Sequence, residues 1–173
     1  FHMKRSYLLL ISLVTCLFAP QAFAFTDLSS QNDETAIEYL EDEGIVEGYS
    51  DGTYRPDAAI NRAELLKILV ESRVSDVLND EDCFTDVNDE WYAPYVCYAE
   101  EEGWVEGYSD GTFGPGKNIN RAEAIAMMLK VYADEVELLD VEQIEEAVYL
   151  DVSNSDWYAD YLYTGKVMGV LSG

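Results

Sequence analysis

The sequence predicts a mainly α-helical fold made of tandem helix-loop-helix repeats with very short strands in the loops. The first observation is an internal repeat: residues 25–72 align without a gap with residues 84–131, at an interval of 59, and 21 of the 48 positions are identical. The second is that each copy places a glycine-rich loop between two stretches with helical spacing of apolar residues. A third copy begins at Tyr149 and reaches Gly173. Such a period indicates that each copy is one supersecondary unit that buries its apolar face against neighbouring copies.

The first 24 residues have the pattern of a secretory signal. Two residues precede what reads as the natural start, Met3, and we interpret them as an expression remnant. Residues 3–24 then combine a charged start, an apolar middle and the small-residue pattern Ala22-Phe23-Ala24, which is typical of a cleaved signal peptide. We therefore expect a secreted protein of the cell envelope or cell surface that begins at Phe25. The alternative is a lipoprotein modified at Cys16.

Cleavage of this signal would leave two cysteines, Cys83 and Cys97, in an exported chain. An even number of cysteines in that compartment favours a disulfide. In the chain-entropy model the bond would close a loop of about 15 residues and stabilise the fold by about 3 kcal/mol. Two unrelated buried thiols are the alternative. A metal site is disfavoured because no histidine or third cysteine follows residue 24.

The charge of the chain is strongly negative. After residue 24, eight basic residues stand against 35 acidic ones, which leaves a formal charge of −27. Such a field repels nucleic acid and anionic lipid, so neither a nucleic-acid partner nor membrane insertion is expected. A solvated surface is the simplest account of this acidity. Runs such as Glu100–Glu102 and Asn79–Asp82 could collect calcium weakly, but no segment has the spacing of a calcium-binding loop, and no cofactor is expected.

The first helix of each copy is expected to end at a glycine. In the second copy, Trp91 and Tyr95 lie at helical spacing, and Pro94 is tolerated because it lies in the first turn. Gly103 then ends this helix, as Gly44 does in the first copy, because glycine accepts the left-handed conformation that closes a helix. The residues that follow read as two very short extended pieces around a tight Asp-Gly turn.

The second helix of each copy is expected to begin with an asparagine cap. Asn61 and Asn120 each precede Arg-Ala-Glu, and the glutamates, Glu64 and Glu123, can reach back to the amide of the cap. The apolar helices that follow are predicted to form the core. Between the second and third copies, Asp134–Val148 has the leucine, valine and isoleucine spacing of an amphipathic linker helix.

An arginine follows each cap, at Arg62 and Arg121. Both lie in the first helical turn, where the helix dipole disfavours a cation by a few tenths of a kcal/mol. A repeated residue at a mildly unfavourable position suggests a role beyond helix stability. The alternative is that each arginine pairs with a neighbouring carboxylate and braces the loop.

These motifs resemble S-layer homology domains. The second copy matches nearly throughout, in Phe84-Thr85-Asp86-Val87, Trp91-Tyr92, the loop at 107–113 and Arg121-Ala122-Glu123. The first copy matches from its loop onward, and the third matches in its first half. The resemblance implies copies packed around a pseudo-threefold helical core. It divides the chain into repeat 1 (25–72), a linker (73–83), repeat 2 (84–132), a helical linker (133–148) and a partial repeat 3 (149–173).

The resemblance also implies a function. Domains of this family anchor exported proteins to a cell-wall polysaccharide, often one with pyruvylated sugars, which they hold in grooves between adjacent copies. A guanidinium beside an aromatic platform suits a carboxylated sugar. The implied glycan-binding residues are Arg62 and Arg121 as carboxylate contacts, Asp51 and Asp110 as acceptors from sugar hydroxyls, Trp91 and Trp157 as stacking faces, and the loop glycines Gly48 and Gly107.

The chain departs from the family pattern in two ways. Asparagine stands where the family usually has threonine, at Asn61 and Asn120, and repeat 3 stops before its loop, which suggests a fragment of a longer protein. A structural or oligomerising envelope protein, whose repeats contact surface-layer or other envelope proteins, is the alternative function. An enzyme is not expected, because no histidine follows residue 24 to serve as the base of a nucleophilic triad.

Overall fold

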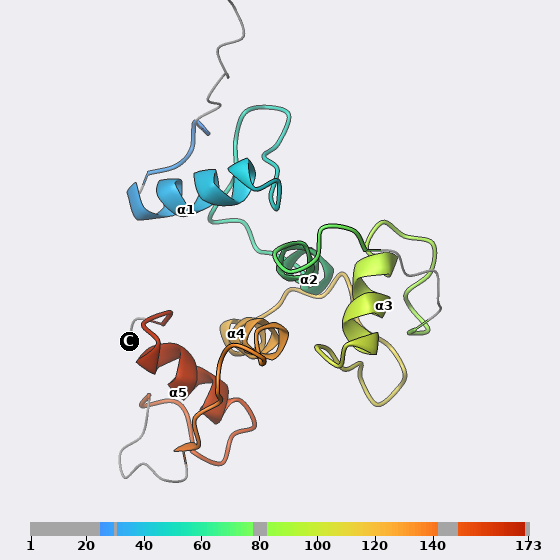
Figure 1. Cartoon of the computed structure of the whole chain (residues 1–173), viewed down its shortest axis with the longest axis vertical. Helices are drawn as coiled ribbons and strands as arrows, with labels where there is room; N and C mark the ends of the chain where they lie inside the picture. The colour runs from blue at the N-terminus through green and yellow to red at the C-terminus, as the bar shows by residue number, and fades with distance from the viewer. Residues whose placement is uncertain (1–24, 30, 78–82, 142–148, 172–173) are drawn as a thin grey trace, which may run out of the picture.

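The computed structural model describes residues 25–29, 31–77, 83–141 and 149–171. In these ranges the fold is mainly α-helical, as predicted. The expected signal, with Cys16, and the acidic run at 79–82 lie outside the described residues. No helix in the described ranges is both long and apolar enough to cross a bilayer. The helices are α1 (Gln31–Asp42), α2 (Arg62–Glu71), α3 (Ala93–Glu101), α4 (Arg121–Val131) and α5 (Ala159–Val167) (Figure 1).

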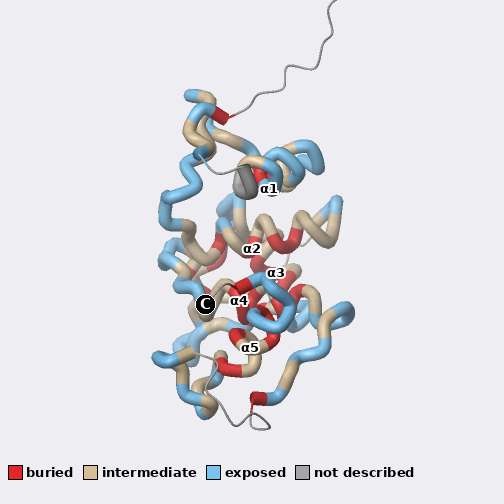
Figure 2. Tube along the Cα trace, turned by 90° about the vertical axis from the view of Figure 1, so that its left-hand side faces the viewer, coloured by how far each residue is buried: buried red, intermediate tan, exposed pale blue. Residues whose placement is uncertain are grey.

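The core lies where the second helices of the repeats meet. α2 packs against α3 and α4, and α4 also packs against α5; Figure 1 shows α2 and α4 nearly end-on. Figure 2 shows that buried segments gather along α2 to α5, whereas α1 is mostly exposed. The pseudo-threefold arrangement implied by the resemblance stays a prediction. The main cluster contains Leu66, Val70, Val96, Phe113 and Val131, and burial of each such side chain contributes about 1.5–3 kcal/mol.

Both asparagine caps form as predicted. In α2, the Glu64 amide donates to Asn61 Oδ1 at 2.9 Å and the Asn61 amide donates to Glu64 Oε2 at 2.9 Å. In α4, the Glu123 amide donates to Asn120 Oδ1 at 2.9 Å and the Asn120 amide donates to Glu123 Oε2 at 3.1 Å. Each closed capping box satisfies an amide of the first turn and fixes the direction in which the chain enters the helix.

Helix α3 is held at both ends. Pro94 lies in its first turn, as predicted. Gly103, just after its end, has a φ of 72°, as does Gly44 after α1. The predicted disulfide joins Cys83 to Cys97, with 5.2 Å between the two Cα atoms. The segment before repeat 2 is therefore tied covalently to α3.

The short strands expected in the loops are not formed within the described residues. The tight turn itself is present, because the Tyr108 amide donates to the Thr112 carbonyl at 2.7 Å. The amides after the turn, however, donate to an aspartate carboxylate of the same repeat, so they do not continue a ladder. An isolated antiparallel bridge between Asn61 and Asn118 is the nearest approach to a strand in this part of the chain.

The linker helix expected over Asp134–Val148 is not formed over residues 134–140, so the prediction is wrong for that part. Residues 133–135 form a turn and 136–140 are irregular, while 142–148 lie outside the described residues. The amides of residues 135 and 136 close the turn on the Tyr132 carbonyl. Two later amides donate to α5: that of Leu139 to Thr164 Oγ1 at 2.9 Å and that of Val141 to Asp160 Oδ1 at 2.9 Å. These two bonds tie the segment to α5.

Candidate ligand-binding grooves

An aspartate near the start of each full repeat positions the loop of that repeat. In repeat 2, Asp86 accepts from the amides of Phe113 and Gly114 at 2.7 and 2.8 Å. In repeat 1, Asp27 accepts from the amides of residues 54 and 55 at 2.8 and 2.7 Å. These backbone hydrogen bonds, first that of residue 54, lower the pKa of Asp27. The ring of Phe113 also packs against Phe84, with 5.5 Å between centroids. The loop of each full repeat is therefore held in the same way by the aspartate near the start of that repeat.

The first groove lies between successive repeats, and we call it the Arg62 groove. Its volume is about 250 Å³. Repeat 1 contributes Arg62 from α2, repeat 2 contributes its loop and one face of α4, and repeat 3 contributes Trp157. The lining comprises Arg62, Trp104, Val105, Glu106, Tyr108, Glu123, Ala126, Met127, Lys130 and Trp157.

Arg62 crosses from one repeat to the next. Its Nε donates to the Phe113 carbonyl at 3.1 Å, and its Nη2 donates to the Glu106 carbonyl at 3.1 Å. The guanidinium carbon lies 4.7 Å from the centre of the Phe113 ring and 5.7 Å from that of Tyr108. Arg62 thus braces the loop through backbone carbonyls, not through the carboxylate pairing considered from the sequence. Its positive charge is therefore not cancelled by a bonded carboxylate within the described residues.

A second groove, the Arg55 groove, occupies the equivalent place one repeat earlier. Its volume is about 490 Å³. Seven of its fourteen residues lie 59 positions before residues of the Arg62 groove, for example Tyr49 before Tyr108. The next repeat again contributes a tryptophan, Trp91. The lining comprises Ile45, Val46, Glu47, Tyr49, Tyr54, Arg55, Pro56, Ala58, Ala59, Ile60, Glu64, Lys67, Ile68 and Trp91.

A cation lies over the loop tyrosine next to each groove. The guanidinium carbon of Arg55 is 3.9 Å from the centre of the Tyr49 ring, and Lys117 Nζ is 3.8 Å from that of Tyr108. Such contacts contribute about 0.5–1 kcal/mol at exposed sites. Arg55 has a φ of 63°, in the left-handed region, where the equivalent residue of repeat 2 is a glycine. Sequence reasoning missed these residues, although the tyrosine belongs to the repeated Gly-Tyr-Ser-Asp-Gly-Thr loop.

The tryptophans predicted as stacking faces are exposed at the grooves. Trp91 retains 56% and Trp157 retains 63% of its accessible surface. Each ring lies edge-on to the tyrosine that follows it, at 5.3 Å for Trp91 and 5.4 Å for Trp157. The adjacent tyrosine therefore helps to orient a large apolar face that remains open to solvent.

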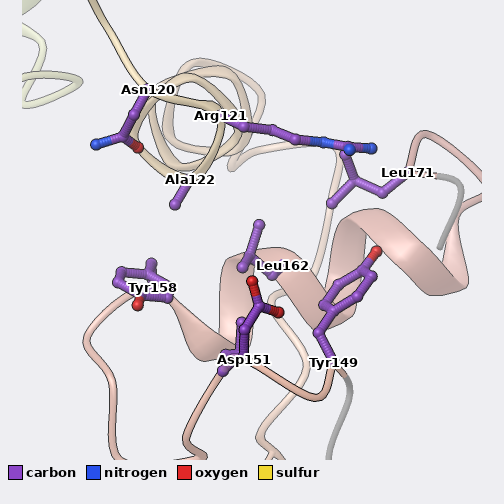
Figure 3. Close-up of a pocket in the computed structure, with 9 residues that line it drawn as sticks. Asn120, Arg121, Ala122, Tyr149, Asp151, Tyr158, Leu162 and Leu171 are labelled. Atoms are coloured by element: carbon purple, nitrogen blue, oxygen red, sulfur yellow. The ribbon is translucent and has the colours of Figure 1, made fainter.

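A third hollow, the Arg121 cavity, lies between the start of α4 and repeat 3 and has a volume of about 360 Å³ (Figure 3). It is lined by Asn120, Arg121, Ala122, Tyr149, Asp151, Val152, Tyr158, Leu162 and Leu171. Tryptophan is absent from this lining. Five of the eight basic residues after residue 24 line one of the three hollows. The scarce positive charge of the chain is thus concentrated where a ligand could enter.

Four of the predicted site residues have structural contacts instead of lining the grooves. Asp51 and Asp110 each accept from a threonine hydroxyl of their own turn, at 2.6 and 2.7 Å. That hydrogen bond is the main reason why the pKa of Asp51 falls to about 2. A Cβ at Gly48 or Gly107 would lie only 2.0 or 2.4 Å from a phenylalanine ring atom. The structure therefore brings Arg62 and Trp157 to one groove and Trp91 to another, and leaves Arg121 in a separate cavity.

Within the described residues, no group of three or more histidine, cysteine, aspartate and glutamate side chains is placed to hold a metal ion. A weak calcium site therefore stays a prediction that rests on the acidic runs alone. The run at 100–102 lies at the end of α3, and the run at 79–82 lies outside the described residues.

Comparison with known proteins identifies matching families and relatives. The family model described as the S-layer homology domain matches residues 24–66 and 84–125. A cellulosome-anchoring protein of Acetivibrio thermocellus is 32% identical over 98 residues, which cover 54% of this chain and 22% of that protein. A middle cell wall protein of Brevibacillus brevis is 29% identical over 161 residues, covering 84% of this chain and 15% of that protein. A surface-layer 125 kDa protein of Lysinibacillus sphaericus is 30% identical over 164 residues, covering 94% and 13%. The chain therefore spans less than a quarter of the length of these relatives.

Proposed function

Because the chain belongs to the S-layer homology family, we propose that its repeats form a non-catalytic module that binds an acidic cell-wall polysaccharide and anchors an exported protein to the wall. Family membership, with surface-layer and cell-wall proteins among the relatives, indicates a secreted cell-surface protein. The observation that carries the proposal is the recurrence of one groove in two successive repeats, each with a cation, a loop tyrosine and an exposed tryptophan.

The chemistry of the grooves favours a carboxylated sugar. A guanidinium binds a carboxylate through charge-assisted hydrogen bonds, which are about twice as strong as neutral ones. The apolar face of a sugar ring packs well on an indole, and Trp91 and Trp157 each leave such a face open. The net charge of the chain is −25, yet basic side chains collect at these grooves. Binding of a neutral sugar would not require such a concentration of positive charge.

Arg62 has no carboxylate partner among the described residues, whereas Arg55 already pairs with Asp51 at 2.8 Å and Lys67 pairs with Glu71. We therefore assign the acidic substituents of the glycan, such as those of a pyruvylated sugar, to the Arg62 groove, and expect the Arg55 groove to bind the same glycan mainly through Trp91.

The predicted site residues fit this proposal to different degrees. Arg62 and Trp157 would contact one sugar segment, and Trp91 with Arg55 would contact another. Asp51 and Asp110 would act indirectly, by holding the loop turns. Arg121 stands one repeat after Arg62 and would complete an equivalent groove if a loop were docked beside it.

The proposal is tested by co-sedimentation of the protein with purified wall sacculi. We expect Trp157→Ala and Trp91→Ala each to reduce the retained fraction several-fold at limiting sacculi, because each removes an exposed stacking face that no core contact requires. Tyr39→Ala is the matched control, since Tyr39 is 62% exposed and lines neither groove. Unchanged retention of both tryptophan variants would contradict the glycan assignment.

Removal of the acid-labile carboxylated substituents from the sacculi supplies a second arm of this experiment. We expect retention to fall on the treated sacculi and to weaken with added salt on the untreated ones, because screening reduces the attraction between an exposed cation and a carboxylate. Equal retention on both preparations would mean that the glycan is not recognised through its acidic groups.

Protein contact is a second candidate function, favoured by three exposed apolar side chains. Val167, Met168 and Val170 lie at the end of α5 and are 48–59% exposed. A surface-layer or other envelope protein could cover them. Sedimentation velocity of the protein with and without envelope extract stripped of polysaccharide distinguishes this function, because a glycan anchor alone would not form a complex there.

A further inference from the structure

The second helix of each full repeat forms one wall of a groove, and the two walls differ in charge. α2 contributes Lys67 to the Arg55 groove. α4 contributes Ala126 and Lys130 to the Arg62 groove. Ala126 stands 59 positions after Lys67, and Lys130 stands 59 positions after Glu71. Both helices are described in full, so an acidic residue of the first wall corresponds to a basic residue of the second.

In α2, Glu71 holds the ammonium of Lys67. The two side chains lie one helical turn apart, are 23% and 27% exposed, and bring Lys67 Nζ to 2.5 Å from Glu71 Oε2. Lys67 Nζ also donates to the Ile45 carbonyl at 3.3 Å. Because Glu71 Oε2 is itself buried, a ligand that drew the ammonium away would leave a buried carboxylate without an opposite charge, which is strongly unfavourable. Lys67 is therefore withheld from a ligand carboxylate.

Helix α3 keeps Glu71 in this position. α3 packs against α2 (Figure 1), and the Tyr95 hydroxyl donates to Glu71 Oε1 at 2.7 Å. This hydrogen bond is the main reason why the pKa of Tyr95 rises to about 12, so the hydroxyl stays protonated and remains a donor at neutral pH. Each carboxylate oxygen of Glu71 is thus engaged by a neighbouring side chain.

The other cation that lines the Arg55 groove is also engaged, within its own loop. Arg55 Nη2 donates to Asp51 Oδ2 at 2.8 Å. Its Nε donates to Thr53 Oγ1 at 3.2 Å. Both cations that line this groove are therefore bound to groups of the same repeat.

Lys130 is held much less firmly in the wall of the Arg62 groove. Its Nζ lies 3.6 Å from Glu106 Oε1, and the Glu106 side chain is 84% exposed. An ion pair of this length at the surface contributes little to stability, so a ligand can replace it. Ala126, one turn earlier, brings no charge to this wall. The ammonium of Lys130 is therefore available to a ligand carboxylate, in the same groove as the guanidinium of Arg62.

We propose that the residue at the equivalent positions 71 and 130 sets the ligand selectivity of each groove. Glu71 suits the Arg55 groove to an uncharged sugar, because it occupies the cation of that wall. Lys130 suits the Arg62 groove to a sugar that carries a carboxylate. This selectivity rests on the proposed function, because it concerns which part of the same glycan each groove takes. A glycan that fills both grooves would combine uncharged and carboxylated sugars.

The test uses two matched ligands: a methyl hexoside that carries a pyruvate ketal, and the methyl ester of the same compound. The two differ in charge and have nearly the same shape. Binding is followed by NMR, through the amides of residues 45–47 for the Arg55 groove and 104–106 for the Arg62 groove. In the parent protein we expect the Arg62 groove to bind the acid several-fold more tightly than the ester, because a charge-assisted hydrogen bond forms only with the acid. The Arg55 groove should bind the two ligands alike.

Glu71→Gln removes the negative charge and keeps an acceptor for the Tyr95 hydroxyl. We expect the Arg55 groove of this variant to prefer the acid several-fold, because Lys67 is then released to the ligand. Adding Lys67→Met to the variant should abolish that preference, which a change in folding alone would not do. The matched control is Glu38→Gln, which changes the net charge by the same amount at an exposed residue that lines neither groove.

The opposite change is made in the other groove. Lys130→Gln should reduce the preference of the Arg62 groove for the acid and leave the binding of the ester unchanged. A parent protein in which both grooves prefer the acid equally would overturn the selectivity and leave glycan binding intact, as would a Glu71→Gln variant that binds as the parent does. If neither ligand shifts a groove amide in the parent or in any variant, the proposed function is overturned together with the selectivity.

Discussion

The ring of Phe84 lies so close to Gly107 that no side chain can be added there without moving the loop or the ring. A Cβ at Gly107 would be 2.4 Å from Phe84 Cε1 and 2.7 Å from the Thr112 carbonyl oxygen. The repeated glycine, which the resemblance assigns to ligand binding, thus has a packing reason in both full repeats. Arg55 illustrates what one sequence cannot predict at this scale, because an arginine in the left-handed region is uncommon and nothing in its neighbours announces it.

Gly107→Ala should lower the free energy of unfolding by about 1–3 kcal/mol, since overpacking displaces a ring or a backbone carbonyl. The measurement is urea denaturation followed by tryptophan fluorescence. Gly116→Ala is the control, because a Cβ there has no atom within 4 Å and no positive φ opposes it. It should be neutral or slightly stabilising, by up to about 1 kcal/mol. Equal effects of the two substitutions would refute the packing argument.

At the scale of the element, the second helices were predictable and the loops were only partly so. Asparagine followed three residues later by glutamate is a local signal, and both capping boxes form. The turn is local too, and it forms. Whether the chain after the turn pairs as a strand depends on a carboxylate 27 residues earlier, which takes its amides. For residues 134–140 the predicted linker helix was wrong for the same reason, because the apolar spacing resembles a helix while the amides of Leu139 and Val141 bond to α5.

Asn120→Ala should lower the free energy of unfolding by about 1 kcal/mol, the usual effect of deleting a side-chain cap. Asn120→Thr restores an acceptor of the kind that the family usually has and should recover most of that loss. Both are measured by chemical denaturation at neutral pH. A threonine variant as unstable as the alanine variant would mean that the amide contributes through contacts other than the cap.

At the scale of the whole molecule, the two full repeats could be predicted, and the family model matches both of them, but the membership of the grooves could not. The exact period identifies Arg62 and Arg121 as equivalent, yet one lies in a groove with a tryptophan and the other in a cavity without one. Which repeat contributes which wall depends on tertiary packing between α2, α4 and α5. The disulfide was predictable from composition and compartment, because two cysteines in an exported chain favour a bond.

Replacing Cys83 and Cys97 by serine should lower the free energy of unfolding by about 3 kcal/mol, because the bond closes a short loop that is otherwise free in the unfolded chain. Denaturation with and without reductant checks this: the reductant should destabilise the parent protein and leave the serine variant unchanged. A parent protein insensitive to reductant would show that the bond does not constrain the unfolded state as this model requires.

The composition of the Arg62 groove has a consequence for how such chains can be dissected or recombined. Its guanidinium belongs to one copy, its loop and helical wall to the next, and its exposed indole to a third. The copy that is duplicated in the sequence is therefore smaller than the unit that forms one groove. Excising a single copy would discard two walls of its own groove, and exchanging one copy between chains would alter two neighbouring grooves at once.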